Sequence, residues 1–221
     1  MHLSIGKWVQ LGSTATTIHR LLESFGMNSQ RSELVTSSIL HKTLSNLPSA
    51  TLNWIQNFKL PLSMPPCKIT NTSTNTNLSI ELDYLFTTLS APGAVTKSGG
   101  YVAASKTLHC LFPELAPMID GRHTGTSYFH IDRASYTPPL GLTKWEDWNG
   151  SPLHGVANPS PKGAGRSNWD SARFIAAIGV NQHIFELWKN GNTSRCTVDF
   201  LALDPTPGTT GLPRIIDKLL W

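Results

Sequence analysis

The residues with the clearest chemical potential lie in one stretch, 99–120, which combines a glycine pair with a carboxylate. Gly99 and Gly100 permit a positive φ angle and a close approach of the backbone to a ligand. If a helix begins at Tyr101, its first amides and the positive end of its dipole would face an anion such as a phosphate. Asp120 follows an apolar linker and would face the molecule that carries this phosphate. The stretch therefore predicts a phosphate-binding turn followed by a carboxylate, Asp120, that would face the bound molecule.

This order of turn, helix, linker and Asp resembles the helix-hairpin-helix DNA glycosylases. In that family a glycine-rich hairpin binds the phosphodiester backbone, and an Asp at the end of the linker stabilises the sugar cation that forms as the base leaves. The resemblance covers about residues 80–123, and the segment 117–121 is similar to the Asp-bearing segment of the adenine-mismatch branch. Tyr101 stands where bifunctional members carry a Schiff-base lysine. The resemblance therefore implies a monofunctional enzyme, and we expect neither a cofactor nor a metal.

A nearer match is a group of small helix-hairpin-helix proteins with the pattern Ala-Ser-Lys-x-Leu-His, then Pro-x-Leu-x-Pro and an Asp. This pattern is present from Ala104 to Asp120. Two departures stand out. The hairpin, residues 95–100, lacks the usual Gly-x-Gly form, and residues 121–125 replace the valine and arginine that usually follow the Asp. The departures concern the phosphate contacts and the substrate geometry, respectively.

The resemblance and the local charge together indicate which residues would contact double-stranded DNA. The expected DNA contacts are Lys97, Ser98, Gly99, Gly100, Tyr101 and Lys106 in the hairpin, and Lys162 and Arg166 in a later basic loop. Residues that could line a pocket, or stack on a base taken out of the duplex, are His109, His123, Trp145 and Trp148. Each residue also has a purely structural interpretation. Lysines beside turns are commonly solvated, tryptophans commonly belong to the core, and an Asp before a glycine is common at helix N-caps and turns.

Composition limits the class of protein. With 221 residues, of which 39% are hydrophobic, the chain is long enough to form a single domain, residues 1–221, with a sizeable core. A net charge of +4 with 14% charged residues predicts local rather than extensive contact with nucleic acid. The three cysteines include no Cys-x-x-Cys, and the eight histidines lack metal-ligand spacing, which argues against a metal site. No apolar run has the length of a membrane span or signal peptide, so we expect an intracellular protein without membrane contact.

Hydrophobic periodicity predicts an all-α, helix-hairpin-helix glycosylase-like fold of two helical lobes. The expected helices span residues 13–25, 32–44, 50–58, 79–91, 101–112, 169–189 and 212–221. In the helix 101–112, Lys106 and His109 share the face opposite the apolar residues. The polar tract 68–78 is expected to be an exposed loop at the lobe boundary, and residues 124–165 a long irregular region.

Two other classes of function remain open beside the glycosylase. A DNA-binding module could keep the hairpin and lack the pocket, in which case Asp120 would only cap a helix or turn. A protein-interaction scaffold with an irregular central region would show no salt-sensitive binding to DNA, because that sensitivity comes from counterion release at phosphates.

Overall fold

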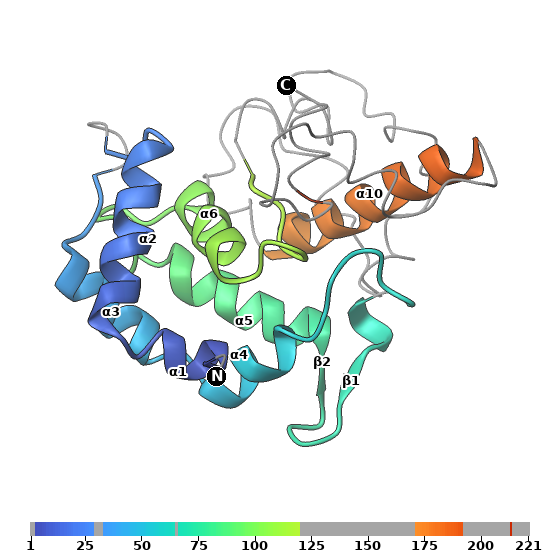
Figure 1. Cartoon of the computed structure of the whole chain (residues 1–221), viewed down its shortest axis with the longest axis horizontal. Coiled ribbons are helices and arrows are strands. Elements are labelled where there is room, and N and C mark those ends of the chain that lie inside the picture. The colour runs from blue at the N-terminus through green and yellow to red at the C-terminus, as the bar shows by residue number, and fades with distance from the viewer. Residues whose placement is uncertain (1–2, 29–32, 65, 120–170, 192–212, 214–221) are drawn as a thin grey trace.

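The computed structural model describes residues 3–28, 33–64, 66–119, 171–191 and 213, and Figure 1 draws the others as a grey trace. Over the described residues the chain is mostly helical, with one small two-stranded sheet. In chain order the elements are α1 (Ile5–Trp8), α2 (Gly12–Ser24), α3 (Ser37–Ser45), α4 (Ser49–Ile55), the 3₁₀ helix η1 (Pro66–Lys68), β1 (Thr70–Asn71), β2 (Thr76–Asn77), α5 (Leu78–Ser90), α6 (Tyr101–Leu111) and α10 (Ser171–Asn190). The all-α expectation is therefore confirmed at the level of class.

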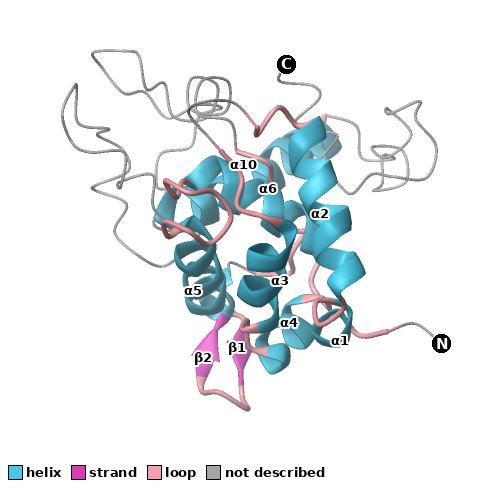
Figure 2. Cartoon of the chain, turned by 90° about the vertical axis from the view of Figure 1, so that its left-hand side faces the viewer, coloured by secondary structure: helices cyan, strands magenta, loops and turns pink. Residues whose placement is uncertain are grey.

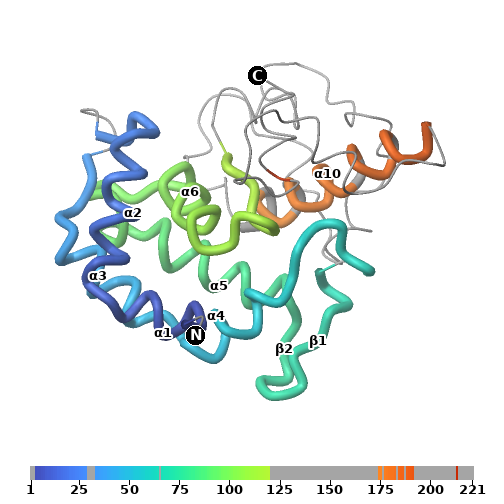
Figure 3. Tube along the Cα trace, in the orientation of Figure 1, coloured from blue at the N-terminus to red at the C-terminus, as the bar shows by residue number. Residues whose placement is uncertain are grey.

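Helix α5 occupies the middle of the described structure, as the tube in Figure 3 shows. Helix α6 packs against both α5 and α2, α10 packs against α5, and α3 and α4 complete the other end with α2 and α1. A continuous apolar core joins these helices and includes Leu22, Leu44, Leu82, Leu108 and Phe174. The hairpin formed by α5 and α6 is thus supported from both sides.

The helices with regular apolar spacing are confirmed almost to the residue. Helices α2, α5 and α6 begin within one residue of the expected positions, and α10 fills the described part of the expected helix 169–189. The helical spacing of apolar residues predicts one buried face on α2 with Ile18, Leu21 and Leu22, and one on α5 that includes Ile80 and Tyr84. Ile18 and Leu22 are fully buried, whereas Leu21, Ile80 and Tyr84 are exposed.

The expected helix 32–44 begins too early. Helix α3 starts at Ser37, after the Thr36 hydroxyl, which accepts a bond from the Ile39 amide as an N-cap. Residues 33–35 are instead extended and pair with the turn between α5 and α6, through an isolated antiparallel bridge between Leu34 and Thr96. Pairing with a segment about sixty residues away overrides the local helical spacing.

The tract 68–78 is mostly exposed, as expected, but it is not irregular: it contains the short β-hairpin of β1 and β2, whose strands project below α5 in Figure 2. Two threonine hydroxyls of this tract bond to Glu81, which lies in the first turn of α5. The Glu81 side chain is buried, and the residue is only 7% exposed. The carboxylate accepts bonds from Thr51 (2.9 Å), Thr74 (3.1 Å) and Thr76 (2.6 Å). Three donors and the helix dipole compensate for burial of this charge.

The short helix α1 has no counterpart among the expected elements. Side chains of α4 and its C-cap bind the first amides of α1: Asn53 Oδ1 accepts from Gly6 N at 2.8 Å, and Gln56 Oε1 from Ile5 N at 3.0 Å. Of the expected closing helix 212–221, Pro213 is described, as a buried helical residue, and the irregular region 124–165 lies outside the described residues. Within the described ranges, no helix has both the length and the apolar character needed to cross a bilayer.

Candidate functional site

The turn between α5 and α6 is closed by its last two residues, Gly99 and Gly100. The Gly100 amide donates to the carbonyl oxygen of Ser90, the last residue of α5, at 2.9 Å. Gly99 has a φ of +74°, and a Cβ atom there would lie 2.6 Å from the Ser90 oxygen and 2.8 Å from the Pro92 nitrogen. A side chain at Gly99 is thus excluded both by backbone conformation and by space. The expected positive φ angles are observed at both glycines, since Gly100 has a φ of +145°.

Gly100 is also the N-cap of α6, and α6 begins at Tyr101 as the sequence predicts. No side chain of the described residues makes a cap hydrogen bond at this end of the helix. The first turn of α6 therefore presents backbone amides and the positive end of the helix dipole beside Gly99 and Gly100, which have no side chains. This arrangement is suited to an anion.

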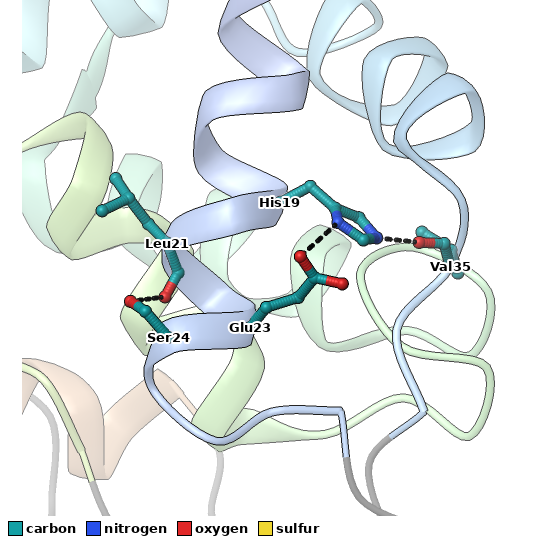
Figure 4. A network of polar contacts seen from close by, with 5 residues as sticks. All are labelled: His19, Leu21, Glu23, Ser24 and Val35. Atoms are coloured by element: carbon teal, nitrogen blue, oxygen red, sulfur yellow. Dashed lines mark hydrogen bonds and ion pairs between the residues drawn. The ribbon is translucent and has the colours of Figure 1, made fainter.

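A segment that the sequence analysis did not identify holds the turn in place. The Lys97 amide donates to Glu33 O at 2.8 Å, and the Val35 amide donates to Val95 O at 3.0 Å. Behind this pairing, His19 Nε2 lies 2.9 Å from the Val35 carbonyl oxygen and His19 Nδ1 lies 3.8 Å from Glu23 Oε2 (Figure 4). His19 thus connects α2 to Val35, which in turn pairs with the turn, and Glu23 lies beside the other ring nitrogen of His19.

The two hairpin lysines have different surroundings. Lys97 Nζ forms an ion pair with the Glu33 carboxylate, and both side chains are exposed, by 63% and 57%. Lys106 Nζ donates to the Phe25 carbonyl oxygen at 3.1 Å and lies 5.5 Å from the centroid of the Phe25 ring. Because Phe25 is the C-cap of α2, Lys106 places its charge at the negative end of that helix. Lys97 belongs to the turn itself, whereas Lys106 is bound to a neighbouring helix.

The other two hairpin candidates form local contacts. The Ser98 hydroxyl lies 3.4 Å from the Gly99 carbonyl oxygen, at the long end of hydrogen-bond range. Tyr101 is half-buried and packs against the core. Residues 97–101 are consecutive, so the structure brings five of the expected DNA contacts together at one turn.

Two polar side chains on α6, one helical turn apart, fix the linker that leads toward Asp120. The Ser105 hydroxyl is fully buried and accepts a bond from the Ile119 amide at 3.0 Å. His109 Nδ1 lies 2.7 Å from the Ala116 carbonyl oxygen. A carbonyl oxygen can only accept, so Nδ1 carries the proton and donates. The linker backbone is therefore attached to α6 at Ala116 and at Ile119.

His109 differs from its expected surroundings. The sequence analysis placed it with Lys106 on a face opposite the apolar residues, but His109 is only 9% exposed. The reason is the linker, which covers this side of α6 and supplies the carbonyl of Ala116. Ser105, whose role the sequence analysis missed, was visible only as a small residue in a helix, and its contact with Ile119 has no local signal.

The remaining candidates lie outside the described residues. These are Asp120, His123, Trp145, Trp148, Lys162 and Arg166. Within the described ranges there is no group of three or more His, Cys, Asp or Glu side chains that could hold a metal ion.

A cavity of about 300 Å³ lies elsewhere, among α1, α4 and the end of α6. Trp8, Phe58 and Phe112 contribute to its walls, together with the polar side chains of Gln56 and Glu114. None of the expected site residues that the structure describes lines it. The cavity and the hairpin turn are therefore separate features.

No protein-family model, curated protein or solved structure matches this chain.

Proposed function

We propose that the chain is a helix-hairpin-helix DNA-binding protein, in which the turn between α5 and α6 binds phosphates of duplex DNA. The observation that carries the proposal is the pair of positive-φ glycines at the N-terminus of α6, a helix end without a side-chain cap among the described residues. A phosphate oxygen can accept from backbone amides there and gain from the helix dipole. Lys97 and Ser98 extend the same surface, and Lys106, Lys162 and Arg166 are proposed as further contacts.

We further propose that this protein is a monofunctional DNA glycosylase of two helical lobes that acts on intracellular DNA. In this reaction the bond between C1′ of the sugar and the base nitrogen breaks, and water supplies the oxygen that replaces the base. Asp120 would stabilise the positive charge that develops on the sugar. Support comes from Ser105, which fixes the backbone of Ile119, the residue before Asp120. The extruded base would then meet His123, Trp145 or Trp148, with His109 beneath the linker.

The experiment uses the full chain and a panel of duplexes, each with one altered base, followed by detection of abasic sites. Asp120→Asn is tested beside Asp83→Asn, which removes an exposed carboxylate from α5 and serves as the matched control. We expect base release from at least one duplex, with release lost in Asp120→Asn and retained in Asp83→Asn.

Other outcomes separate the alternatives. Salt-sensitive binding to duplexes without base release would assign the chain to non-catalytic DNA-binding modules. Absence of both binding and release would refute the DNA proposal and favour a protein-interaction scaffold. Equal base release by the wild type and Asp120→Asn would remove Asp120 from the mechanism.

A further inference from the structure

Glu33 is connected to the hairpin turn at two points. Its carbonyl oxygen accepts a bond from the Lys97 amide at 2.8 Å, and its carboxylate forms an ion pair with Lys97 Nζ. Here the backbone bond holds the two residues side by side, so the carboxylate stays near the ammonium group.

The segment that carries Glu33 is itself fixed. Val35 bonds to Val95 on one side and to His19 on the other, and Leu34 forms a bridge with Thr96. The backbone of Glu33 therefore has a defined place beside the hairpin turn, and its carboxylate reaches Lys97 from there. A phosphate that approached this turn would meet the Glu33 charge before it could pair with Lys97.

A competing anion can also replace the Glu33 carboxylate at Lys97. Both side chains are more than half exposed, and an ion pair in such surroundings is weak and further screened by salt. A phosphate can thus displace the carboxylate from Lys97 without disturbing the core. Displacement leaves Glu33 close to the phosphate, where like charges repel each other.

We propose that Glu33 is an electrostatic competitor for Lys97 that lowers the affinity of the hairpin for backbone phosphates of duplex DNA. This inference rests on the proposed DNA-binding function and adds a control element to that surface. The intact pair reduces the number of phosphates that the turn neutralises. Removal of the carboxylate makes Lys97 available and should also increase the dependence of binding on salt.

The test measures binding of the full chain to a fluorescent undamaged duplex by anisotropy, over a range of salt concentrations. Glu33→Gln keeps the backbone bond and removes the charge. We expect tighter binding by about threefold to tenfold at low salt, and a slope of log K against log salt that steepens by about 0.9, the value for one additional neutralised phosphate. Asp83→Asn changes the net charge equally on an exposed part of α5 and is the matched control.

The double variant Glu33→Gln/Lys97→Gln tests whether the effect passes through Lys97. We expect it to bind no more tightly than Lys97→Gln alone. The inference is overturned if Glu33→Gln gains no more than Asp83→Asn, or if its gain persists without Lys97. A wild-type protein that does not bind the duplex even at the lowest salt concentration refutes the proposed function, and the role of Glu33 with it. Thermal unfolding followed by circular dichroism checks that each variant is folded.

Discussion

At the scale of single residues, Ser105 joins the linker to α6 through one buried hydroxyl group. Its hydroxyl accepts from Ile119 N and has two carbonyl oxygens within reach of its single proton, Val102 at 3.0 Å and Ile119 at 3.3 Å. Ser105→Ala would leave the buried Ile119 amide without its acceptor. We expect the free energy of unfolding to fall by about 1–3 kcal/mol, the usual cost of an unsatisfied buried donor. Urea denaturation measures this change.

Thr107 provides the control on the same helix. Its hydroxyl is equally buried but bonds to the Ala103 carbonyl one turn earlier in α6, at 2.8 Å. Thr107→Val removes that hydroxyl without depriving any backbone amide of an acceptor, so the loss should be smaller than for Ser105→Ala. Equal losses in the two variants would show that the bond to Ile119 contributes nothing beyond burial of a hydroxyl.

Cys110 gives a prediction for pH. Burial raises the pKa of its thiol from 9.0 to about 11. The folded state therefore holds this proton more tightly than the unfolded state, so the resulting stabilisation is fully present below pH 9 and is lost as the pH rises toward 11.

The reactivity of Cys110 follows from the same shift. In a variant whose only cysteine is Cys110, alkylation at pH 8 should be slower by about a hundredfold in the folded chain than in urea, because the thiolate is the nucleophile. Equal rates in the two conditions would contradict the burial of this thiol. Cys67→Ser and Cys196→Ser produce the variant needed.

At the scale of elements, the α5–α6 hairpin requires a glycine at position 99. Gly99→Ala would impose a positive φ on alanine and place its Cβ 2.6 Å from the Ser90 carbonyl oxygen. Backbone strain of this kind costs about 1–3 kcal/mol, and the steric clash adds to it. We expect a loss of at least about 2 kcal/mol in the free energy of unfolding, together with weaker binding to duplex DNA.

Gly12→Ala is the matched control. Gly12 is the first residue of α2, and a Cβ there would meet no heavy atom within 4 Å. Alanine favours helix more than glycine does, so this variant should be as stable as the wild type or slightly more stable. If Gly99→Ala and Gly12→Ala unfold at the same urea concentration, the close approach of Gly99 to Ser90 does not constrain the hairpin.

Most of the elements could be predicted from the sequence where their signal is local. Apolar spacing is a pattern within each of the helices α2, α5, α6 and α10. The glycine pair lies directly before Tyr101, the first residue of α6. The positive φ angles at Gly99 and Gly100 could be predicted for the same reason.

Several failures arise instead from contact between distant segments. Residues 33–35 are extended because they pair with 95–97. The tract 68–78 is a partial exception, because its strands pair locally, Thr70 with Asn77, and only the Thr51 hydroxyl reaches Glu81 from a distant segment. The ion pair between Glu33 and Lys97 joins residues 64 positions apart, so the sequence analysis could identify Lys97 as a candidate contact but not its partner. Local patterns carry no information on such pairs.

At the scale of the whole molecule, the core continues from the N-terminal helices into α10. Phe86 on α5 and Phe174 on α10 stack with their ring centroids 4.9 Å apart. Nearby, the Gln182 amide bonds to both the amide and the carbonyl oxygen of Leu62, each at 2.9 Å. Residues separated by about a hundred positions are thus joined by both apolar and polar contacts, which favours unfolding of the described helices as one cooperative unit.

Phe174→Ala tests this cooperativity, because Phe174 is fully buried and its removal leaves a cavity beside Phe86. A change of this kind costs about 3–5 kcal/mol, a large fraction of the stability of a typical domain. If the described helices form one unit, helix content measured by circular dichroism and the fluorescence of the seven tryptophans should shift together to lower urea concentration. These tryptophans include Trp8 on α1, Trp54 on α4 and Trp188 on α10, so the signal reports on both ends of the described structure. Tyr84→Ala, which removes an exposed aromatic side chain from α5, should leave both transitions nearly unchanged. A split into two transitions, with only one displaced by Phe174→Ala, would instead show that α10 unfolds independently of the N-terminal helices.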